Sequence, residues 1–384
     1  MRLLYVIDSL APGGAETSLV HLTPGLITRG IEVHVLPLGA RLDLRSPLLE
    51  AGAIVHTPPP PGGRAANVRA IMEEARALRP HLIHTTLFEA DIAGRAAGRL
   101  LHIPSSTSLV NDSYGPSHYS ESKWIKLTAA RALDASTGRF ASRFHALSTS
   151  IADAVSARLR LPRDHVDVVP RGRRPEDFPF RPNALRSATR RELDLDADVP
   201  VILGIGRLEP QKGFQHLLAA LPAVQREHPK LVTLIAGKEG RSGESLRGQA
   251  GRLGIDVRFM GHRSDVAALL AAADVFCFPS EREGFGGVLI EAMAAGCPIV
   301  ATAIPTTIEV TGGCKHSVAE LVSTGDRSAL ADSLTRTLSR DSPTATRVRS
   351  GRARFERKYT IDAITDPMVQ FFERAASPMG SRRK

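Results

Sequence analysis

The sequence predicts an α/β protein of two doubly wound domains, each a parallel sheet with helices on both faces. Its 384 residues are enough for two ordinary domains and too many for one small core. Short β-rich runs alternate with helical stretches, a pattern typical of parallel strands joined by crossover helices. The alternation breaks once, in the polar stretch 181–199, and then starts again.

Seven strand-like runs predict the sheet of an N-terminal domain, which we place at residues 1–180. These runs cover residues 2–7, 31–38, 53–57, 81–86, 105–110, 144–148 and 166–170. The stretches between them include segments of helical character at 68–78, 90–100 and 151–161.

Six further runs predict a C-terminal domain at residues 200–357, which follows a linker at 181–199. These runs cover residues 201–206, 231–236, 256–261, 275–279, 298–302 and 318–322. We expect one or two helices over 352–376, and we expect the C-terminal helix within 358–384 to pack back on the first domain. Two such domains in tandem predict a ligand cleft between them, because doubly wound sheets bind ligands beyond the carboxyl ends of their strands.

Composition and charge exclude some classes of protein and favour others. No apolar run approaches the roughly 20 residues of a membrane span, and the first apolar run stops at Asp8, so we expect a cytoplasmic protein. The net charge is +10, and residues 347–384 hold ten Arg or Lys against four Asp or Glu. This basic end favours phosphate-rich partners, with peripheral contact at the inner face of an anionic membrane as one option. A single Trp and 5% aromatic residues argue against a nucleic-acid partner.

The first segment with chemical character is DSLAPGGAE, residues 8–16, which follows the first strand and opens a helix near Ala15. Gly13 and Gly14 allow close approach of backbone to a ligand, and the start of a helix offers free N–H groups to an anion. The spacing is not GxGxxG, so a dinucleotide fingerprint is excluded. A plain tight turn is the alternative interpretation.

The second segment is GIGRLEPQKGF, residues 204–214, where a strand leads directly to Arg207 and then to Lys212. Two cations beyond a strand's carboxyl end are suited to a diphosphate, because a guanidinium pairs with phosphate oxygens and an ammonium adds a point charge. The order of residues excludes a Walker A loop. A solvated basic loop is the alternative.

The third segment is PSEREGFGGVLIEAMAAGCP, residues 279–298. A helix is predicted from about Val288 to Ala295, with Glu283 before its start and Glu291 about one turn inside. The two carboxylates therefore flank a helix N-terminus whose dipole attracts phosphate, and carboxylates accept hydrogen bonds from vicinal hydroxyls. The alternative is that Glu291 is a capping or surface residue.

In this order, GGAE, GRLEPQKGF and EGFGGVLIEAMAAGCPIVAT resemble the retaining glycosyltransferases of the family-4 type. Residues 146–174 also resemble that family's connection between domains, and the likeness covers roughly residues 1–340. The resemblance implies the GT-B architecture, in which two Rossmann-like doubly wound domains face each other across a cleft.

The resemblance also implies a role for each matching residue. Arg207 and Lys212 match the diphosphate clamp, Glu291 the residue that binds the ribose hydroxyls, and Glu283 the residue that holds the donor sugar. Glu283, Arg207 and Lys212 are thus the expected catalytic residues. The expected backbone donors to the donor substrate are Gly284, Phe285 and Gly286, and the loop facing donor phosphate and acceptor holds Gly13 and Gly14.

We expect neither a metal nor a cofactor. Cleavage of the anomeric C–O bond leaves negative charge on the diphosphate, which Arg207, Lys212 and the helix start near Gly287 can stabilise. The DxD spacings of Asp194, Asp196 and Asp198 lie in the expected linker, and no HExxH is present. The three cysteines (Cys277, Cys297 and Cys314) show no CxxC spacing, and we expect reduced thiols in the core.

Two stretches depart from the family pattern. The family often carries a His after the fourth or fifth strand, where this chain has the stretch 108–112. We therefore expect Asn111 and Asp112 on the acceptor side, with the nearby histidines His84, His102 and His118 not assigned that role. Residues 304–309 lack the Gly pair of many relatives and should lie near the donor.

The sequence therefore predicts a metal-independent retaining glycosyltransferase that uses a nucleotide-diphosphate sugar, with UDP favoured. Its acceptor is expected to be a saccharide, a lipid-linked saccharide or a small-molecule hydroxyl. A nucleotide-sugar epimerase or a sugar phosphorylase on the same fold is one alternative, and a non-catalytic nucleotide-sugar-binding subunit is another.

Overall fold

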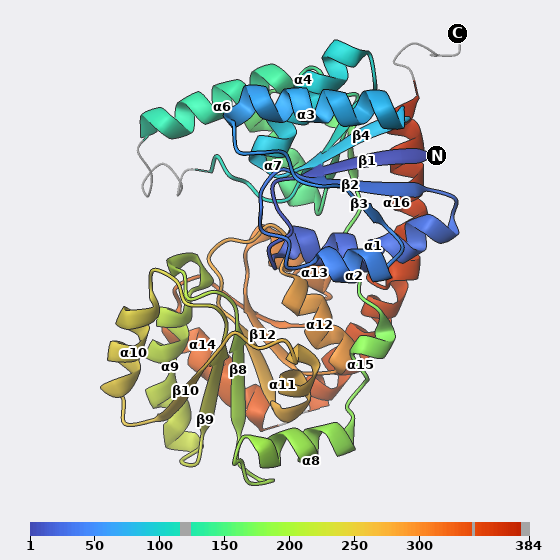
Figure 1. Ribbon diagram of the computed structural model, residues 1–384. Helices are drawn as coiled ribbons and strands as arrows, with labels where there is room; N and C mark the ends of the chain where they lie inside the picture. Colours follow the sequence, from blue (N-terminus) through green and yellow to red (C-terminus); the bar gives the residue numbers. More distant parts are fainter. Residues whose placement is uncertain (116–123, 340–341, 378–384) are drawn as a thin grey trace. The chain divides into compact units, whose positions relative to one another are not determined.

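The computed structural model describes residues 1–115, 124–339 and 342–377, and the chain divides into two compact units. Unit 1 comprises Met1–Gly172 with Ile361–Lys384, and unit 2 comprises Arg173–Thr360 (Figure 1). The expected domain boundary at residue 180 falls inside unit 2, because residues 173–180 belong with that unit. In the described chain, no helix is both long enough and apolar enough to cross a bilayer.

Unit 1 is built on a parallel sheet with the strand order β3-β2-β1-β4-β5-β6-β7. The described strands are β1 (Arg2–Ile7), β2 (Glu32–Pro37), β3 (Ile54–Val55), β4 (Leu82–Thr86), β5 (Ser105–Leu109), β6 (Arg143–Ala146) and β7 (Val166–Val168). Each overlaps a predicted run. The chain moves outward from β1 to β3 and then returns to the other side of β1, which gives the doubly wound order.

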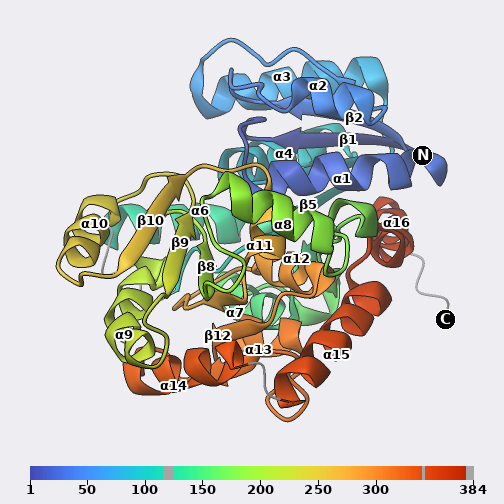
Figure 2. The same cartoon turned by 90° about the horizontal axis from the view of Figure 1, so that it is seen from below.

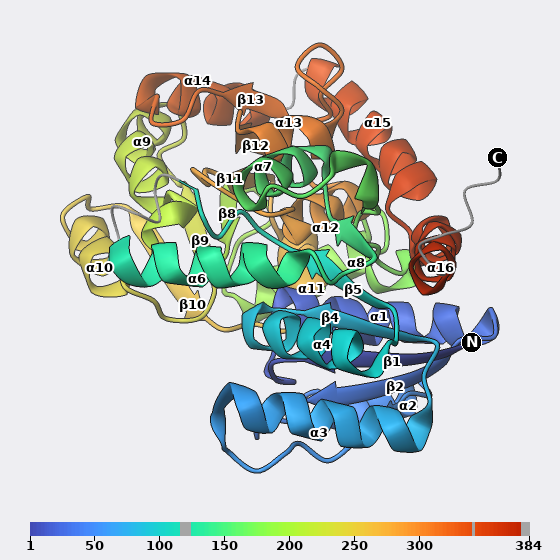
Figure 3. The ribbon, with the colours of Figure 1, turned by 90° about the horizontal axis from the view of Figure 1, so that it is seen from above.

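Helices cover both faces of this sheet, as Figure 3 shows from above. They are α1 (Gly14–Thr28), α2 (Arg45–Glu50), α3 (Gly63–Leu78), α4 (Phe88–Leu101), α6 (Trp124–Gly138), α7 (Thr149–Leu159), the short η1 (Arg163–His165) and α16 (Ile361–Ala376). α3 and α4 share one core with the sheet, and α1, α2 and α16 share another. The last helix is held there because its apolar residues recur at helical spacing, with Phe371 and Phe372 fully buried.

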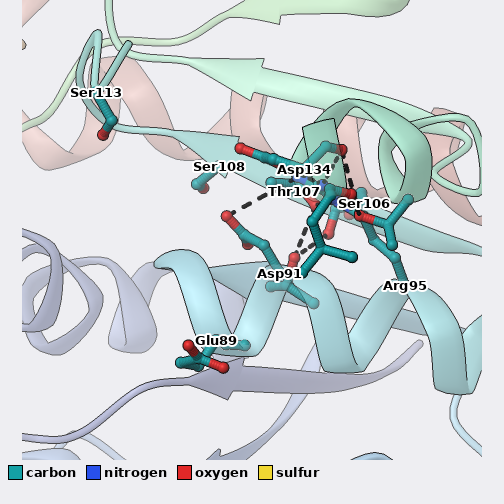
Figure 4. A network of polar contacts seen from close by, with 12 residues as sticks. Glu89, Asp91, Arg95, Ser106, Thr107, Ser108, Ser113 and Asp134 are labelled. Carbon is teal, nitrogen blue, oxygen red and sulfur yellow. Dashed lines mark hydrogen bonds and ion pairs between the residues drawn. The ribbon is translucent and has the colours of Figure 1, made fainter. Parts of the chain in front are cut away.

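A polar network is buried in unit 1 between α4, α6 and β5 (Figure 4). The Arg95 side chain is fully buried; its Nη1 donates to Asp134 Oδ1 at 2.6 Å and its Nε to Thr107 Oγ1 at 2.8 Å. Tyr114 donates to the other oxygen of Asp134 at 2.8 Å. Asp91 lies 3.9 Å from Arg95, and its Oδ1 is buried without a hydrogen-bond partner among the described residues. One guanidinium thus lies beside two acidic side chains, and burial raises the pKa of Asp91 to about 8.

Replacing Asp91 by Asn is expected to stabilise the protein, and increasingly so as the pH rises. Because the pKa of Asp91 is raised from 3.8 to about 8, the folded protein keeps a proton that the unfolded chain releases. The free energy of unfolding of the wild type therefore falls as the pH rises through this window, at up to about 1.4 kcal/mol per pH unit. Thermal unfolding over a pH series should show the gap between Asp91→Asn and wild type widening.

The matched control for this prediction is Asp153→Asn. Asp153 is an exposed partner of Arg163, so its replacement should change stability by less than about 1 kcal/mol. A gap between Asp91→Asn and wild type that stays constant with pH would show that Asp91 is ionised in the folded protein.

Unit 2 is built on a second parallel sheet, with the strand order β10-β9-β8-β11-β12-β13. Its described strands are β8 (Val201–Ile205), β9 (Val232–Ala236), β10 (Asp256–Gly261), β11 (Val275–Phe278), β12 (Ile299–Thr302) and β13 (Glu320–Val322). All six overlap predicted runs, and the prediction of two doubly wound parallel sheets is confirmed.

The helices of unit 2 also lie on both faces of its sheet (Figure 2). They are η2 (Pro175–Asp177), α8 (Asn183–Glu192), η3 (Pro210–Lys212), α9 (Phe214–Glu227), α10 (Gly243–Gly251), α11 (Val266–Ala272), α12 (Gly287–Ala295), α13 (Pro305–Thr311), α14 (Arg327–Leu338) and α15 (Ser342–Lys358). α9, α10 and α14 share the main apolar core with the sheet. Cys277 and Cys297 are buried, but Cys314 is exposed, so the expectation of a core thiol is wrong for Cys314.

The stretch expected to be a linker, 181–199, contains α8. The polar face of this helix is tied to the end of α11: Arg186 donates to three backbone carbonyls, and both Arg186 and Arg190 pair with Asp274, at 2.7 and 3.4 Å. Arg186 and Arg190 thus have partners within unit 2, which a polar composition alone does not reveal.

Candidate active site

The strand order of unit 2 brings the second and third sequence segments together. β8 and β11 are adjacent in the sheet, and the chain turns to opposite sides of it from these two strands. The segment with Arg207 and Lys212 follows the carboxyl end of β8, and the segment with Glu283 follows that of β11. Ligands of doubly wound sheets bind at this switch point, so the sequence candidates converge where the fold favours a site.

The loop after β8 is pressed closely against the loop after β11. Gly213 has φ +68°, and a β-carbon placed on it would lie 1.9 Å from the backbone oxygen of Pro279. Only glycine fits this approach, since it tolerates the left-handed conformation and leaves room for the carbonyl. η3, which ends at Lys212, is thereby fixed beside the Pro279–Glu283 segment. The side chain of Arg207 is exposed.

Lys212 and Glu283 form an ion pair. The ammonium of Lys212 donates to Glu283 Oε1, and Ser280 Oγ donates to the same oxygen at 3.2 Å. The two side chains are only 17% and 14% exposed. Thr306, in α13, donates to the backbone oxygen of Glu283 at 2.9 Å. The stretch 304–309, which departs from the family pattern, thus lies against Glu283.

α12 begins immediately after this pair. Gly286 caps the helix at φ +76° and Gly287 is its first residue. The N–H of Leu289 donates to the oxygen of Gly286 at 2.9 Å, and the N–H groups of Gly287 and Val288 have no partner within the helix. Phe285 is buried, and its ring lies edge-on to Tyr359 at 6.0 Å between centroids. Phe285 anchors the loop, while Gly284 and Gly286 are partly exposed. The helix start can therefore accept an anion.

Glu291 is held by a residue that the sequence did not single out. Arg173 Nε donates to Glu291 Oε1 at 2.7 Å, and the two side chains are 8% and 10% exposed. The guanidinium also lies over the start of α12, because a β-carbon on Gly287 would meet Arg173 Nη2 at 3.0 Å. The backbone N–H of Arg173 donates to the oxygen of Tyr359 at 2.9 Å, which fixes the segment. Sequence reasoning missed Arg173 because the segment RGRR, residues 171–174, has the composition of an ordinary basic loop.

Replacing Arg173 by Met is expected to destabilise unit 2 by about 3 kcal/mol or more, because it leaves the buried carboxylate of Glu291 without its cation. Chemical denaturation would measure the loss. The neighbouring Arg174 provides the matched control, since it pairs with Asp177 at the surface and is 60% exposed. Arg174→Met should cost less than about 1 kcal/mol, and equal losses in the two variants would contradict a structural role for the buried pair.

In unit 1 the first segment forms the start of α1. Gly13 is its N-cap residue. A β-carbon on Gly13 would meet Glu16 Oε2 at 2.5 Å, and one on Gly14 would meet Arg171 Nη1 at 2.5 Å. Glu16 is buried, which raises its pKa. A carboxylate and a guanidinium therefore lie beside the two glycines, and sequence reasoning gave neither Glu16 nor Arg171 a role.

The stretch after β5 contains Asn111 and Asp112, the two residues expected on the acceptor side. Asp112 pairs with Arg158 of α7 at 2.7 Å, and Asn111 accepts a hydrogen bond from Ser113 at 2.5 Å. Both residues therefore have partners within unit 1, and no described contact links them to Gly13 or Gly14.

The nearby histidines are buried or lie elsewhere. His84 is fully buried and its ring nitrogens contact Ser106 and Ser108, at 2.8 and 2.9 Å. His145, which the sequence did not single out, donates through Nε2 to the oxygen of Val169 at 2.7 Å, so its Nδ1 accepts from Ser108 at 2.9 Å. Burial lowers the pKa of His145 to about 4 and that of His84 well below its usual range, so both are neutral at physiological pH.

One other histidine, His102, takes no part in the contacts described above. His102 ends α4 in a left-handed conformation, and His118 lies outside the described residues. Among the residues that the structure describes, no three His, Cys, Asp or Glu side chains gather in a way that could hold a metal ion.

Two family models match this chain. The model described as Glycosyltransferase Family 4 matches residues 12–177, and the one described as Glycosyl transferases group 1 matches residues 199–340. The phosphatidyl-myo-inositol mannosyltransferase of Mycobacterium tuberculosis (strain H37Rv) is 30% identical over 95% of this chain and 94% of its own length. This chain belongs to the family-4 glycosyltransferases. The enzyme named phosphatidyl-myo-inositol mannosyltransferase in Mycobacterium leprae is 38% identical over 46% of this glycosyltransferase. The match spans about half (47%) of that relative's length.

Solved structures agree on the fold of this glycosyltransferase. The crystal structure of HepE from Anabaena in complex with UDP-glucose has a TM-score of 0.83, covers 97% of this chain and 99% of its own, and is 24% identical. The GT-B fold class predicted from the sequence is confirmed, as are the family and the enzyme class.

Proposed function

We propose that this glycosyltransferase moves a sugar, with retention of anomeric configuration, from a nucleotide-diphosphate donor bound at the switch point of unit 2. The observation that carries the proposal is the partly buried ion pair of Lys212 and Glu283, which lies in the loop just before the start of α12. This arrangement places a cation, a carboxylate and free helix N–H groups together. A cation and helix N–H groups are suited to a diphosphate, and a carboxylate is suited to the hydroxyls of a sugar.

Each residue has a task in the proposed reaction. Arg207, Lys212 and the first turn of α12 stabilise the negative charge that develops on the departing diphosphate. Glu283 accepts hydrogen bonds from the sugar hydroxyls, and Glu291, oriented by Arg173, accepts those of the ribose. The charge of the leaving group is met by protein groups, so the proposed reaction uses no divalent metal and no further cofactor.

The acceptor and the sugar are proposed from the names of the relatives. The mycobacterial relatives are named as mannosyltransferases that act on phosphatidyl-myo-inositol. We therefore place a phosphate-bearing inositol lipid first among acceptors and mannose first among sugars. Since HepE was solved with UDP-glucose, UDP is the first nucleotide to test. A lipid acceptor would bring a cytoplasmic enzyme to the membrane surface.

The donor can be tested without knowing the acceptor. The enzyme is mixed with UDP-, GDP-, ADP- and dTDP-sugars in the presence of a chelator, and slow donor hydrolysis and thermal shift are measured. The proposal expects one nucleotide to raise the unfolding temperature, and its sugar to be released. Hydrolysis that requires an added divalent cation would overturn the metal-independent mechanism, and epimerised donor would favour the epimerase alternative.

Replacing Arg207 by Ala is expected to weaken binding of the nucleoside diphosphate by about tenfold or more while leaving nucleoside binding unchanged. Arg207 is exposed, so the loss reports a charge-assisted contact to phosphate rather than a change in folding. Calorimetric titration with nucleoside and nucleoside diphosphate measures the ratio. Arg241→Ala, which removes a surface arginine paired with Glu209, is the control, and an unchanged ratio in Arg207→Ala would remove Arg207 from the clamp.

A further inference from the structure

A second basic region lies on unit 1, on helices that carry none of the candidate active-site residues. α6 and α7, with η1, enclose a groove of about 730 Å³. Four arginines and a histidine line it: Arg131, Arg139, Arg158, Arg160 and His165. No carboxylate is among the described residues of the lining. The groove is thus positively charged on the sides that α6 and α7 provide.

Part of this charge is not neutralised within the protein. Arg158 pairs with Asp112, and Arg131 donates to the backbone oxygen of Arg158 at 2.9 Å. The exposed side chains of Arg139 and Arg160 have no hydrogen bond or ion pair within the described chain. Like charges gathered in one groove repel one another unless an anion binds there.

The groove is also partly apolar, and further apolar side chains of α6 lie beyond its end. Buried leucines and Phe144 form part of the lining. Thr128, Ala135 and Arg139 face the groove at helical spacing, and Trp124 lies one turn before Thr128 on the same stripe. Trp124 is 65% exposed and Ile125 is 63% exposed. Two large apolar side chains in the first turn of one helix (α6, teal in Figure 3) are thus left open to solvent.

The charges on α6 are also suited to an anionic partner. Its single carboxylate, Asp134, is turned inward to Arg95 and Tyr114, so the exposed positions of the helix carry Lys126, apolar residues and the hydroxyls of Thr128 and Ser136, but no carboxylate. Exposed tryptophan beside a basic groove is the combination that lies in the interface of an anionic bilayer, with the ring among the headgroups and the cations on phosphates.

We propose that the α6–α7 groove docks unit 1 on an anionic phospholipid surface, with Arg139 and Arg160 on the headgroup phosphates and Trp124 and Ile125 at the interface. This surface differs from the basic C-terminal stretch that the sequence suggested. The inference does not depend on the proposed transfer reaction, because docking requires neither donor nor acceptor recognition.

Trp124 is the only tryptophan of the chain, so its fluorescence reports directly on this surface. The full-length protein is mixed with vesicles of phosphatidylcholine alone or with added phosphatidylglycerol, a lipid without inositol. We expect a blue shift and protection from a soluble quencher on the anionic vesicles only, and loss of both at high salt. Vesicle binding without a change in Trp124 emission would overturn the proposal, as would equal binding to neutral vesicles.

Charge reversal tests the groove itself. Arg139→Glu with Arg160→Glu should weaken vesicle binding by about 25-fold or more, since each cation near an anionic surface contributes roughly fivefold. The matched control is Arg69→Glu with Arg76→Glu, two exposed arginines of α3 that change the charge of unit 1 equally. Nucleotide binding and thermal unfolding confirm that the variants fold.

The remaining outcomes decide between partners. Equal losses in the groove and control variants would show a general charge effect and overturn the assignment to this groove. A Trp124 shift with a single-stranded oligonucleotide but not with anionic vesicles would replace the membrane by a nucleic acid. We expect the donor-hydrolysis rate to be unchanged in the groove variants, because Arg139 and Arg160 belong to unit 1, whereas Lys212, Glu283 and the start of α12 belong to unit 2.

Discussion

Replacing Glu283 by Gln is expected to reduce sugar transfer and donor hydrolysis by about 10²–10³-fold while leaving nucleotide affinity within a few-fold of the wild type. Gln keeps the size of the side chain but removes the charge that faces the sugar in the proposed reaction. It also removes the charge partner of Lys212, which is then free to bind phosphate. Rates at saturating donor and titration with the nucleoside diphosphate separate the two effects.

Glu281 supplies the control for this variant. It lies in the same loop, but it is 41% exposed and its carboxylate contacts His216 at 2.8 Å. Glu281→Gln should keep transfer within about twofold, since an exposed pair of this kind contributes little. If Glu283→Gln transferred sugar at the wild-type rate, the carboxylate would have no part in holding the donor sugar.

Replacing Gly213 by Ala is expected to destabilise unit 2 by about 3 kcal/mol or more and to abolish donor binding. The added β-carbon would lie 1.9 Å from the oxygen of Pro279, so the two backbone segments must separate. Separation moves Lys212 away from Glu283, and the left-handed φ of +68° adds about 1 kcal/mol of strain. Chemical denaturation and nucleotide thermal shift measure the two losses.

Gly254 distinguishes the steric effect from the backbone effect. Its φ is +64°, close to that of Gly213, but a β-carbon there would meet nothing within 4 Å. Gly254→Ala should therefore cost only about 1 kcal/mol and keep nucleotide binding. Equal costs at the two positions would mean that the loops near Pro279 separate freely and that their close approach does not position the site.

The local sequence determined the elements and most of the candidate chemistry. Alternation of apolar runs and helical stretches is a short-range property, so each described strand of both sheets overlaps a predicted run. Arg207, Lys212, Glu283 and Glu291 were identified in the same way, because each belongs to a short segment at the end of a strand or the start of a helix.

The tertiary structure decided which of these residues meet. Lys212 and Glu283 are 71 residues apart, and they pair because β8 lies beside β11, an order that alternation does not specify. Arg173 and Glu291 are 118 residues apart, and no local pattern marks an arginine whose partner is so distant. The α6–α7 groove likewise exists only because two helices and η1 lie together in unit 1. Local patterns follow from the geometry of one helix or strand, whereas ion pairs and grooves depend on strand order and packing, which the whole chain sets.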